Sequence, residues 1–324
     1  MKILVLTGGE SAEREVAIRS GEAVASALID RGHAVAMLDT VRGADSVTFY
    51  NDKTAMLEQL YSTISVRNAR AQIHPSVLRL CKEADCVFPA LHGGSGEDGT
   101  LQAMLDSVSA RYSGSGHLAC AISMDKALTK TAYADASILT PGFTLYKKGQ
   151  KSPPIPPCYP CVVKPCDGGS SIGVSFVFAP CGLDGALKKA LAVSDTVMLE
   201  RMVIGRELSV SVLENEPLAV TEIIPKRSFF DYESKYKSGG AEEITPAPLP
   251  RDIYDRAMRI AKNAHDALRM RNFSRTDIIF EEQTALLYAL ETNALPGMTE
   301  TSILPQAAKH RGIGYGELCE RMLL

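Results

Sequence analysis

A glycine-rich loop with strand-like runs on both sides is the feature that most constrains the fold. In VVKPCDGGSSIGVSFV, residues 162–177, one apolar run leads into the glycines and a second leaves after Gly173. In a P-loop the lysine follows the glycines and opens a helix, whereas Lys164 precedes them here. The segment therefore predicts a strand–loop–strand hairpin that closes over a ligand. Taken alone, the same residues are also typical of an ordinary hairpin turn.

Length and composition indicate a soluble globular protein. A chain of 324 residues is long for one core, which predicts two or three domains. With 45% hydrophobic and 23% charged residues and a net charge of −3, neither nucleic acid nor a membrane surface is expected as a partner. The opening run KILVLT is too short for a signal peptide, and no stretch approaches the ~20 apolar residues of a membrane span. These observations predict a cytoplasmic protein.

The eight cysteines predict free thiols. A chain this long without a secretion signal does not resemble a small disulfide-stabilised domain. Cys158 and Cys161 have the spacing of a redox motif, but prolines flank them and a strand follows instead of a helix. No second pair of ligands at matching spacing supports a tight zinc site.

Hydrophobic periodicity predicts an α/β region followed by two α+β lobes. The N-terminal region reads as strand, helix and strand over 2–7, 13–31 and 34–39, with a further helix over 54–64, a strand over 84–91 and a helix over 97–108. A strand–helix–strand start of this kind favours a parallel sheet. Next come a helix over 124–137, a proline-rich surface segment or edge hairpin over 147–160, and strands over 161–165, 173–178 and 197–200 with a helix between the last two. The remainder reads as strands over 206–214 and 217–225, a helix over 250–270, a hairpin over 274–293 and two closing helices.

The C-terminal hairpin predicts a patch of oxygen ligands. If its turn centres on residue 284, Asp277 and Glu291 are cross-strand partners, and Asn293 shares the face of Glu291. Hard oxygen ligands suit Mg²⁺ bound to substrate phosphates. Arg275 lies two residues before Asp277, on the same face, where a cation can stabilise a phosphoryl or acyl oxygen. The alternative is an edge hairpin with solvated acids.

A Gly- and Ser-rich hairpin such as 162–177 can close over a nucleotide triphosphate. Binding a triphosphate would need several cations, because one lysine contributes at most about 4 kcal/mol at an effective dielectric near 20. Lys126, Lys164 and Lys235 are the available ones.

Ordered blocks along essentially the whole chain resemble the D-alanine–D-alanine ligases of the ATP-grasp superfamily. The matching blocks are GGESAEREVAIRSG, LHGGSGEDGTLQAML, YSGSGHLACAISMDKALTK, VVKPCDGGSSIGV, LERMVIGREL, FFDYESKYKSGG, SRTDIIF and ETNALPGMTETSILPQAA. The resemblance implies an ATP-grasp fold: an N-terminal α/β substrate domain with a parallel sheet (1–113), a central ATP-grasp lobe (114–203) and a C-terminal ATP-grasp lobe with the metal and acyl-transfer site (204–324).

The resemblance also implies roles for individual residues. Phosphate contacts would come from Lys126, Lys164, Ser171 and Lys235, and adenine and ribose contacts from Glu200, Met202, Val203 and Glu207. Two Mg²⁺ or Mn²⁺ ions would be bound by Asp277, Glu291 and Asn293. The substrate and catalytic groups would be Glu13, His92, Ser170, Tyr236, Arg275, Gly297 and Ser302.

Within that last set, Glu13 would pair with the ammonium of the first D-alanine and His92 would lie near its carboxylate. Ser170 and Tyr236 would complete a hydrogen-bonded group with Glu13. Arg275 and the Gly297 N–H would form an oxyanion hole, and Ser302 would bind the second carboxylate.

Read without the resemblance, several of these residues have plain structural alternatives. Glu13 is also a first-turn helix acid, His92 a loop histidine, Ser302 a helix cap and Tyr236 a packing residue.

The implied reaction makes an acyl phosphate from ATP and D-alanine, and a second D-alanine then displaces phosphate to give D-alanyl-D-alanine for peptidoglycan. An acyl phosphate must be shielded from water, and FFDYESKYKSGG, residues 229–240, is the expected lid. The alternatives are a D-alanine–D-lactate ligase, which the intact Lys235–Tyr236 pair disfavours, another ATP-grasp amide ligase, and a catalytically silent ATP-binding protein.

Three departures from the family pattern are visible: residues 41–80 match poorly, and Arg201 and Ala294 stand where relatives often have lysine and threonine. The family is commonly dimeric, so a homodimer is expected.

Overall fold

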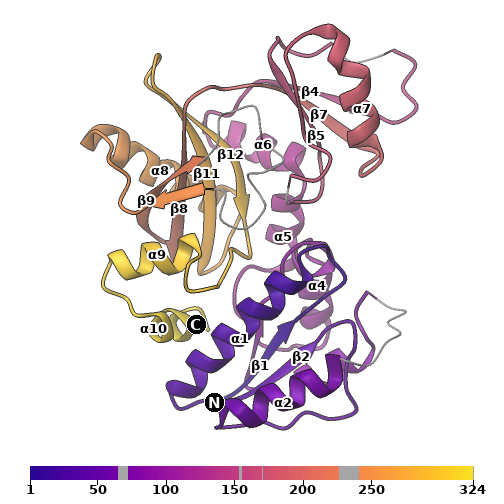
Figure 1. Ribbon diagram of the computed structural model, residues 1–324, viewed down its shortest axis with the longest axis vertical. Helices are drawn as coiled ribbons and strands as arrows, with labels where there is room; N and C mark the ends of the chain where they lie inside the picture. Colours follow the sequence, from indigo (N-terminus) through magenta and orange to yellow (C-terminus); the bar gives the residue numbers. More distant parts are fainter. Residues whose placement is uncertain (65–71, 153–154, 170, 226–240, 324) are drawn as a thin grey trace.

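The computed structural model describes residues 1–64, 72–152, 155–169, 171–225 and 241–323. The described part contains three sheets, which lie in three regions of an elongated molecule (Figure 1). Among the described helices, none is both long and apolar enough to cross a bilayer. All eight cysteines fall in the described ranges and are free thiols, as predicted.

The N-terminal region forms a parallel three-stranded sheet of order β2-β1-β3, which confirms the predicted sheet type. Its apolar β-branched runs are buried on both faces, as expected when helices cover a parallel sheet. The elements are β1 Lys2–Thr7, α1 Arg14–Asp30, β2 Ala34–Asp39, α2 Lys53–Ile64, α3 Ser76–Cys81, β3 Cys86–Pro89, a 3₁₀ turn Gly94–Gly96 and α4 Thr100–Ser107.

The central region carries an antiparallel four-stranded sheet of order β4-β7-β5-β6. Strands β5 and β6 pair directly, so the glycine-rich segment is the strand–loop–strand hairpin predicted from sequence. The elements are α5 His117–Met124, α6 Lys126–Asp135, β4 Phe143–Lys147, β5 Cys161–Pro165, β6 Ser175–Val177, a 3₁₀ turn Pro180–Gly182, α7 Leu183–Leu191 and β7 Thr196–Arg201.

The helix predicted over 124–137 is present as α6, but it begins only at Lys126 because Asp125 is not helical. This residue has extended backbone angles, and its carboxylate accepts hydrogen bonds from the Ala127 and Leu128 N–H groups at 2.8 and 3.1 Å. Asp125 therefore ends α5 and caps the N-terminus of α6. The new helix begins at Lys126, one of the predicted phosphate ligands.

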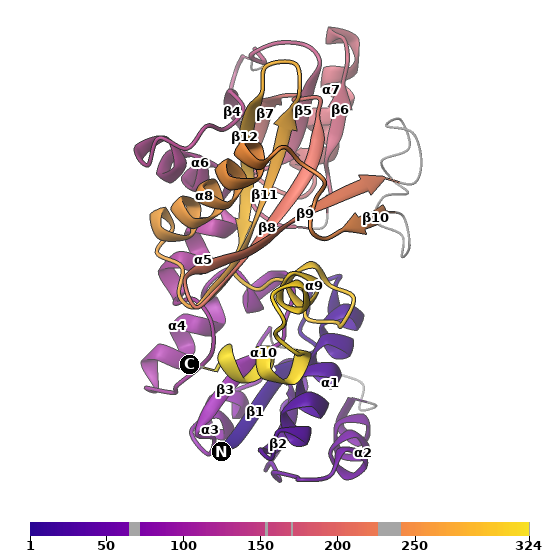
Figure 2. The ribbon, with the colours of Figure 1, turned by 90° about the vertical axis from the view of Figure 1, so that its left-hand side faces the viewer.

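The C-terminal region forms an antiparallel five-stranded sheet of order β10-β9-β8-β11-β12, with α8 packed along one face (Figure 2). The elements are β8 Arg206–Leu213, β9 Glu216–Pro225, β10 Ala241–Ile244, α8 Arg251–Ala267, β11 Phe273–Glu281, β12 Leu286–Asn293, α9 Ile303–His310 and α10 Tyr315–Arg321.

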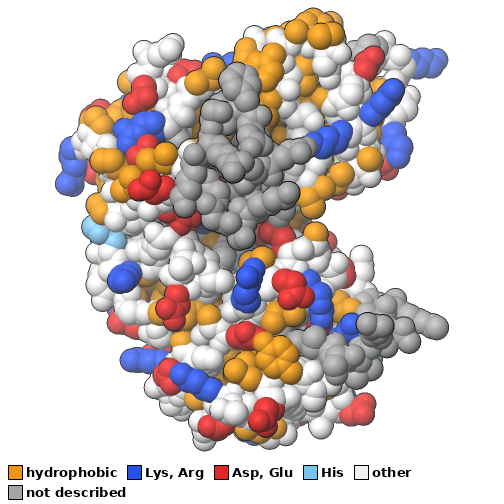
Figure 3. All heavy atoms as spheres, viewed as in Figure 1, with side chains coloured by type: hydrophobic (Ala, Val, Ile, Leu, Met, Phe, Trp, Pro, Cys, Tyr) orange, Lys and Arg blue, Asp and Glu red, His pale blue; other side chains and the backbone are white. Residues whose placement is uncertain are grey.

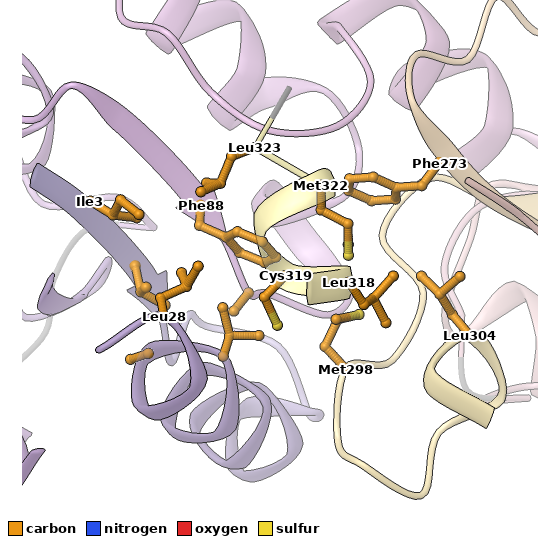
Figure 4. Close-up of a cluster of buried hydrophobic side chains, with 14 of the residues drawn as sticks. Ile3, Leu28, Phe88, Phe273, Met298, Leu304, Leu318, Cys319, Met322 and Leu323 are labelled. Atoms are coloured by element: carbon orange, nitrogen blue, oxygen red, sulfur yellow. The ribbon is translucent and has the colours of Figure 1, made fainter. Parts of the chain in front are cut away.

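The largest apolar core joins the two ends of the described chain. Side chains of α10 and the residues after it, including Leu318, Met322 and Leu323, pack with Ile3 of β1 and Phe88 of β3 (Figure 4). The C-terminal helices therefore hold the N-terminal sheet against the C-terminal lobe.

Candidate active site

One cavity of about 640 Å³ gathers nearly all predicted site residues that the structure describes. Residues from all three regions line it, and Figure 3 shows the surface hollowed between the central region and the N-terminal region below it. The predicted residues on its wall are Glu13, His92, Lys126, Lys164, Ser171, Glu200, Met202, Val203, Glu207, Arg275, Asp277, Glu291, Asn293 and Gly297. Ser170, Lys235 and Tyr236, and the lid predicted over 229–240, lie outside the described residues.

The hairpin β11–β12 brings the predicted oxygen ligands together. Asp277 and Glu291 are cross-strand partners, as predicted. Arg275 donates two hydrogen bonds to Asp277, from Nε at 3.0 Å and from Nη2 at 2.8 Å. The Ser209 hydroxyl and the Asn293 amide donate to the same carboxylate at 2.7 and 3.2 Å. Asp277 is thus fixed by three neighbours, and Arg275 is fixed by Asp277.

Glu291 stays ionised beside three cations. Burial alone raises the pKa of this carboxyl, but Lys126, Lys164 and Arg275 outweigh it and lower the pKa. The Lys126 ammonium is the nearest of them, with its Nζ 3.6 Å from Glu291 Oε2. The carboxylate is therefore held ready for a cation.

The donor chemistry of this patch fits Mg²⁺. Two carboxylates and one amide form a hard-oxygen set of the kind that binds Mg²⁺ together with substrate phosphates. Within the described residues, no group of three or more His, Cys, Asp or Glu side chains lies close enough to hold a metal by itself. The patch therefore suits an ion that takes its remaining ligands from a nucleotide and water.

Lys126, one of the two predicted phosphate-binding lysines on the cavity wall, contacts the glycine-rich loop. Lys126, at the start of α6, donates from Nζ to the Gly168 carbonyl of the hairpin loop at 2.8 Å. Its backbone N–H also donates to the Cys166 carbonyl at 2.8 Å. Gly168 has φ +85°, which favours glycine at this bend. Helix α6 and the glycine-rich loop are therefore joined at the cavity wall.

Glu200 lies at the centre of a buried group of three charges. Its Oε2 accepts from Lys164 Nζ at 2.7 Å, and its Oε1 pairs with Lys130 Nζ. Lys130 also contacts the Thr140 hydroxyl and lies 5.6 Å from the Phe143 ring centroid. The sequence analysis missed Lys130; the available signal was its position four residues after Lys126, which puts both lysines on one side of α6.

Several apolar side chains line the cavity. They include Val162, Phe176 and Ile223, together with Met202 and Val203, the two residues predicted to face adenine. Arg201 also reaches the wall, but its guanidinium pairs with Glu281 at 3.2 Å and lies 4.8 Å from the Tyr288 ring centroid. These contacts with Glu281 and Tyr288 explain the position of the Arg201 side chain without any contact to a nucleotide.

His92 links two segments of the N-terminal side of the site. Its Nε2 lies 3.1 Å from the Ser20 hydroxyl. Burial lowers the pKa of His92, with smaller opposing effects from Glu13 and Leu295. The imidazole is therefore neutral near pH 7.

Glu97 is a pocket residue that the sequence analysis did not select. Its Oε2 accepts from the Gly93 N–H at 2.9 Å. Burial raises its pKa to about 7, assisted by the nearby carboxylates of Glu13 and Glu291 and opposed by Arg275. In the sequence, Glu97 lies in GEDG, which contributed to the family resemblance but predicted no role for this glutamate.

Ser302 lies next to Gly297 but does not itself line the cavity. A Cβ placed on Gly297 would come within 2.9 Å of Ser302 Oγ. Ser302 occupies the N-cap of α9, but its hydroxyl bonds the Thr299 hydroxyl at 2.7 Å and accepts from the Thr299 N–H at 3.2 Å, not from the helix. The side chain therefore does not serve the capping role considered for it.

Family models match both halves of the chain. The description "D-ala D-ala ligase N-terminus" covers residues 2–115, and "D-ala D-ala ligase C-terminus" covers residues 156–324. Among curated relatives, a D-alanine–D-alanine ligase of Syntrophotalea carbinolica is 38% identical over 99% of this chain and 95% of its own length. Another, from Pediococcus pentosaceus, is 36% identical over 100% of this chain and 97% of its own length.

Solved structures agree with these matches. The crystal structure of D-alanine–D-alanine ligase from Bacillus anthracis has a TM-score of 0.78 at 28% identity and covers 100% of this chain and 96% of its own. Its complex with ATP has a TM-score of 0.77 at 26% identity, with the same coverage. The fold is therefore the ATP-grasp fold expected from the sequence, and the chain belongs to the D-alanine–D-alanine ligase family.

Proposed function

We propose that this protein joins two D-alanine molecules into D-alanyl-D-alanine at the expense of ATP, a step in making peptidoglycan precursors. The observation that carries the proposal is the pairing of Asp277 with Glu291 and of Arg275 with Asn293 across one hairpin, in one cavity with Lys126 and Lys164. Such a site can bind a triphosphate, stabilise an oxyanion and hold a divalent ion side by side. Family membership supports D-alanine as substrate, and the ATP complex of the Bacillus anthracis relative supports ATP as the nucleotide.

In the first step, the carboxylate of one D-alanine attacks the γ-phosphorus of ATP, giving an acyl phosphate and ADP. Lys126 and Lys164 hold phosphate oxygens, while Glu200, Met202, Val203 and Glu207 surround the nucleoside. Asp277, Glu291 and Asn293 would hold two Mg²⁺ or Mn²⁺ ions. When bound, these ions offset negative charge on the phosphate oxygens.

In the second step, the amine of another D-alanine attacks the acyl carbon, and phosphate leaves as the peptide bond forms. The developing oxyanion lies beside Arg275 and the Gly297 N–H, whose positions are fixed before the reaction. Glu13 binds the ammonium of the first D-alanine. A contact from His92 Nε2 to its carboxylate would replace the hydrogen bond with Ser20.

Three further assignments remain proposals. Ser170, Ser171, Lys235 and Tyr236 would help close the site over the phosphates, and Ser302 would bind the second carboxylate through a shift of its hydroxyl away from Thr299. We also propose residues 1–113, 114–203 and 204–324 as the functional units, each built around one of the three sheets.

The decisive experiment measures ADP release and dipeptide formation with D-alanine, L-alanine and D-lactate. We expect ADP release with D-alanine alone and a product with the mass of D-alanyl-D-alanine. A preference for D-lactate at neutral pH would identify a depsipeptide ligase. ATP binding without any D-alanine-dependent turnover would identify a silent ATP-binding protein.

A homodimer is proposed as the working assembly. Light scattering should then give twice the chain mass of 34.9 kDa. A value equal to one chain mass would reject the dimer without affecting the assignment of the reaction.

A further inference from the structure

Lys164 is paired with a carboxylate in this structure, although a phosphate is its proposed ligand. Strands β5 and β7 place Val162 opposite Glu200, so Lys164 and Glu200 are diagonal neighbours on one face of the sheet. The Lys164 Nζ to Glu200 Oε2 distance is 2.7 Å, and their side chains are 10% and 4% exposed. ATP phosphates entering the cavity therefore compete with Glu200 for Lys164.

Lys130 approaches the same carboxylate from the other side. It pairs with the second oxygen of Glu200, and its side chain has no exposed area, so it lies behind the cavity wall. Thr140 and the Phe143 ring hold the Lys130 ammonium there. Lys164 lines the cavity, whereas Lys130 does not. The two lysines therefore differ in which of them a nucleotide can reach.

All three groups are charged at neutral pH. Burial lowers the pKa of Lys130 to about 8, against the opposing effect of Glu200. Burial also disfavours charge on Lys164 and Glu200, but their mutual attraction outweighs it, raising the pKa of the lysine and lowering that of the acid. The group thus carries one net positive charge beside the phosphate site.

Separating a buried carboxylate from its only cation is costly, because it leaves an uncompensated charge in a low dielectric. With two lysines on Glu200, the departure of Lys164 leaves one partner in place. We propose that Lys130 is a positioning residue: it remains the counter-ion of Glu200 and thereby releases Lys164 to bind the nucleotide phosphates. This inference rests on the proposed ATP-dependent function and adds a residue to it.

The test compares Lys130→Met with the native protein in nucleotide binding, without D-alanine. We expect the Kd of ADP to rise at least about tenfold, equivalent to about 1.4 kcal/mol. The Kd of adenosine, which has no phosphate, should change less than about threefold. In steady state, KM for ATP should rise while kcat at saturating ATP stays within a factor of about three.

A second-site substitution separates this role from a general packing defect. In a Glu200→Gln background the acid that retains Lys164 is gone, so adding Lys130→Met should change the Kd of ADP less than about twofold. An equal loss in both backgrounds would overturn the proposal, as would equal weakening of ADP and adenosine or no weakening of either. If Lys130→Met does not fold, Lys130→Gln takes its place, because its amide can bond Glu200 and Thr140 without supplying charge.

The outcome is distinguishable from failure of the proposed function. If the native protein makes no dipeptide, the function is wrong whatever Lys130 does. If the native protein is active and Lys130→Met binds ADP normally, only the role of Lys130 is wrong.

Discussion

Asp277 and Glu291 face each other because an irregularity in β12 shifts the strand by one residue. Nearer the turn, Ile278 pairs with Ala289, so a regular ladder would continue by pairing Asp277 with Leu290. The register shift places Glu291 there instead. Since side chains alternate between sheet faces, this single extra residue determines whether the second carboxylate lies beside Asp277.

Glu291→Gln should strongly weaken the use of Mg²⁺. Loss of an outer-shell partner costs about 10–100-fold in metal affinity, so loss of a direct ligand should cost at least as much. The measurement is the Mg²⁺ concentration giving half-maximal D-alanine-dependent ADP release. Glu282→Gln, an exposed acid at the turn of the same hairpin, is the matched control and should behave as native. Native Mg²⁺ dependence in Glu291→Gln would rule out the metal assignment.

Arg275→Lys should lower kcat about 100- to 1000-fold, the size seen when an oxyanion donor is lost. The substitution keeps a positive charge but removes the two-point contact with Asp277, so the remaining ammonium is not held toward the acyl oxygen. KM for ATP should change little, because the nucleoside-facing residues are untouched. Turnover measured with saturating ATP and D-alanine checks this, and a kcat within threefold of native would contradict the oxyanion role.

Gly297→Ala should impair turnover through Ser302. Its new Cβ would come 2.9 Å from Ser302 Oγ, so one of the two must move. A displacement near 1 Å can cost about 100-fold in rate. Gly185→Ala is the control: its Cβ would meet nothing within 4 Å on α7, so stability should rise by about 0.5–1 kcal/mol with unchanged kcat. Equal turnover in both variants would argue against a tight Gly297–Ser302 arrangement.

Acid should destabilise the protein partly through His265. The ring bonds Ser274 Oγ at 2.8 Å and Asn215 Oδ1 at 2.9 Å, and burial lowers its pKa to about 4 from the ordinary 6.5. As pH falls, this histidine therefore takes up a proton at a higher pH in the unfolded chain than in the folded protein. The contribution of His265 to the free energy of unfolding is complete above pH 6.5 and declines as pH falls toward 4. At pH 5 the loss is about 2 kcal/mol.

The check is denaturant unfolding at pH 7.5 and pH 5. His265→Leu should be less stable than native at pH 7.5 but should lose less stability on acidification. His310→Leu, at an exposed histidine, should keep the native pH dependence. The same acid loss in native protein and His265→Leu would exclude this histidine as its source.

Sequence patterns predicted the long elements and the facing carboxylates, but not features that depend on distant partners. Strand β4 has five residues and becomes a strand by pairing with β7, fifty residues further along the chain. Helix α3 has six residues, too few for a helical period to stand out. The Asp277–Glu291 pair was predicted by counting from a turn at 284, and that count holds only because of the register shift.

Buried charge was the hardest property to predict at the site. Lys130 is an ordinary lysine in the helix pattern, and its burial depends on Glu200 arriving from a strand seventy residues later. Glu97 likewise owes its raised pKa first to burial and then to the carboxylates of Glu13 and Glu291, the second of which comes from the C-terminal lobe. The sequence shows residue types and spacing, but such pKa shifts arise from burial and from charges that meet only in the folded protein.

The packing of Leu318, Met322 and Leu323 against the N-terminal sheet also sets an order for folding during synthesis. The apolar cluster between the central sheet and α7 draws on residues between Tyr146 and Leu199, so it can close while the ribosome is still making the C-terminal lobe. The first strand, β1, is made at the outset, and Leu4 and Leu6 on one of its faces pack with residues no later than Tyr112. Ile3 and Val5 on its other face wait for side chains made some three hundred residues later. One face of the N-terminal sheet can therefore reach its final packing only after the central sheet has packed.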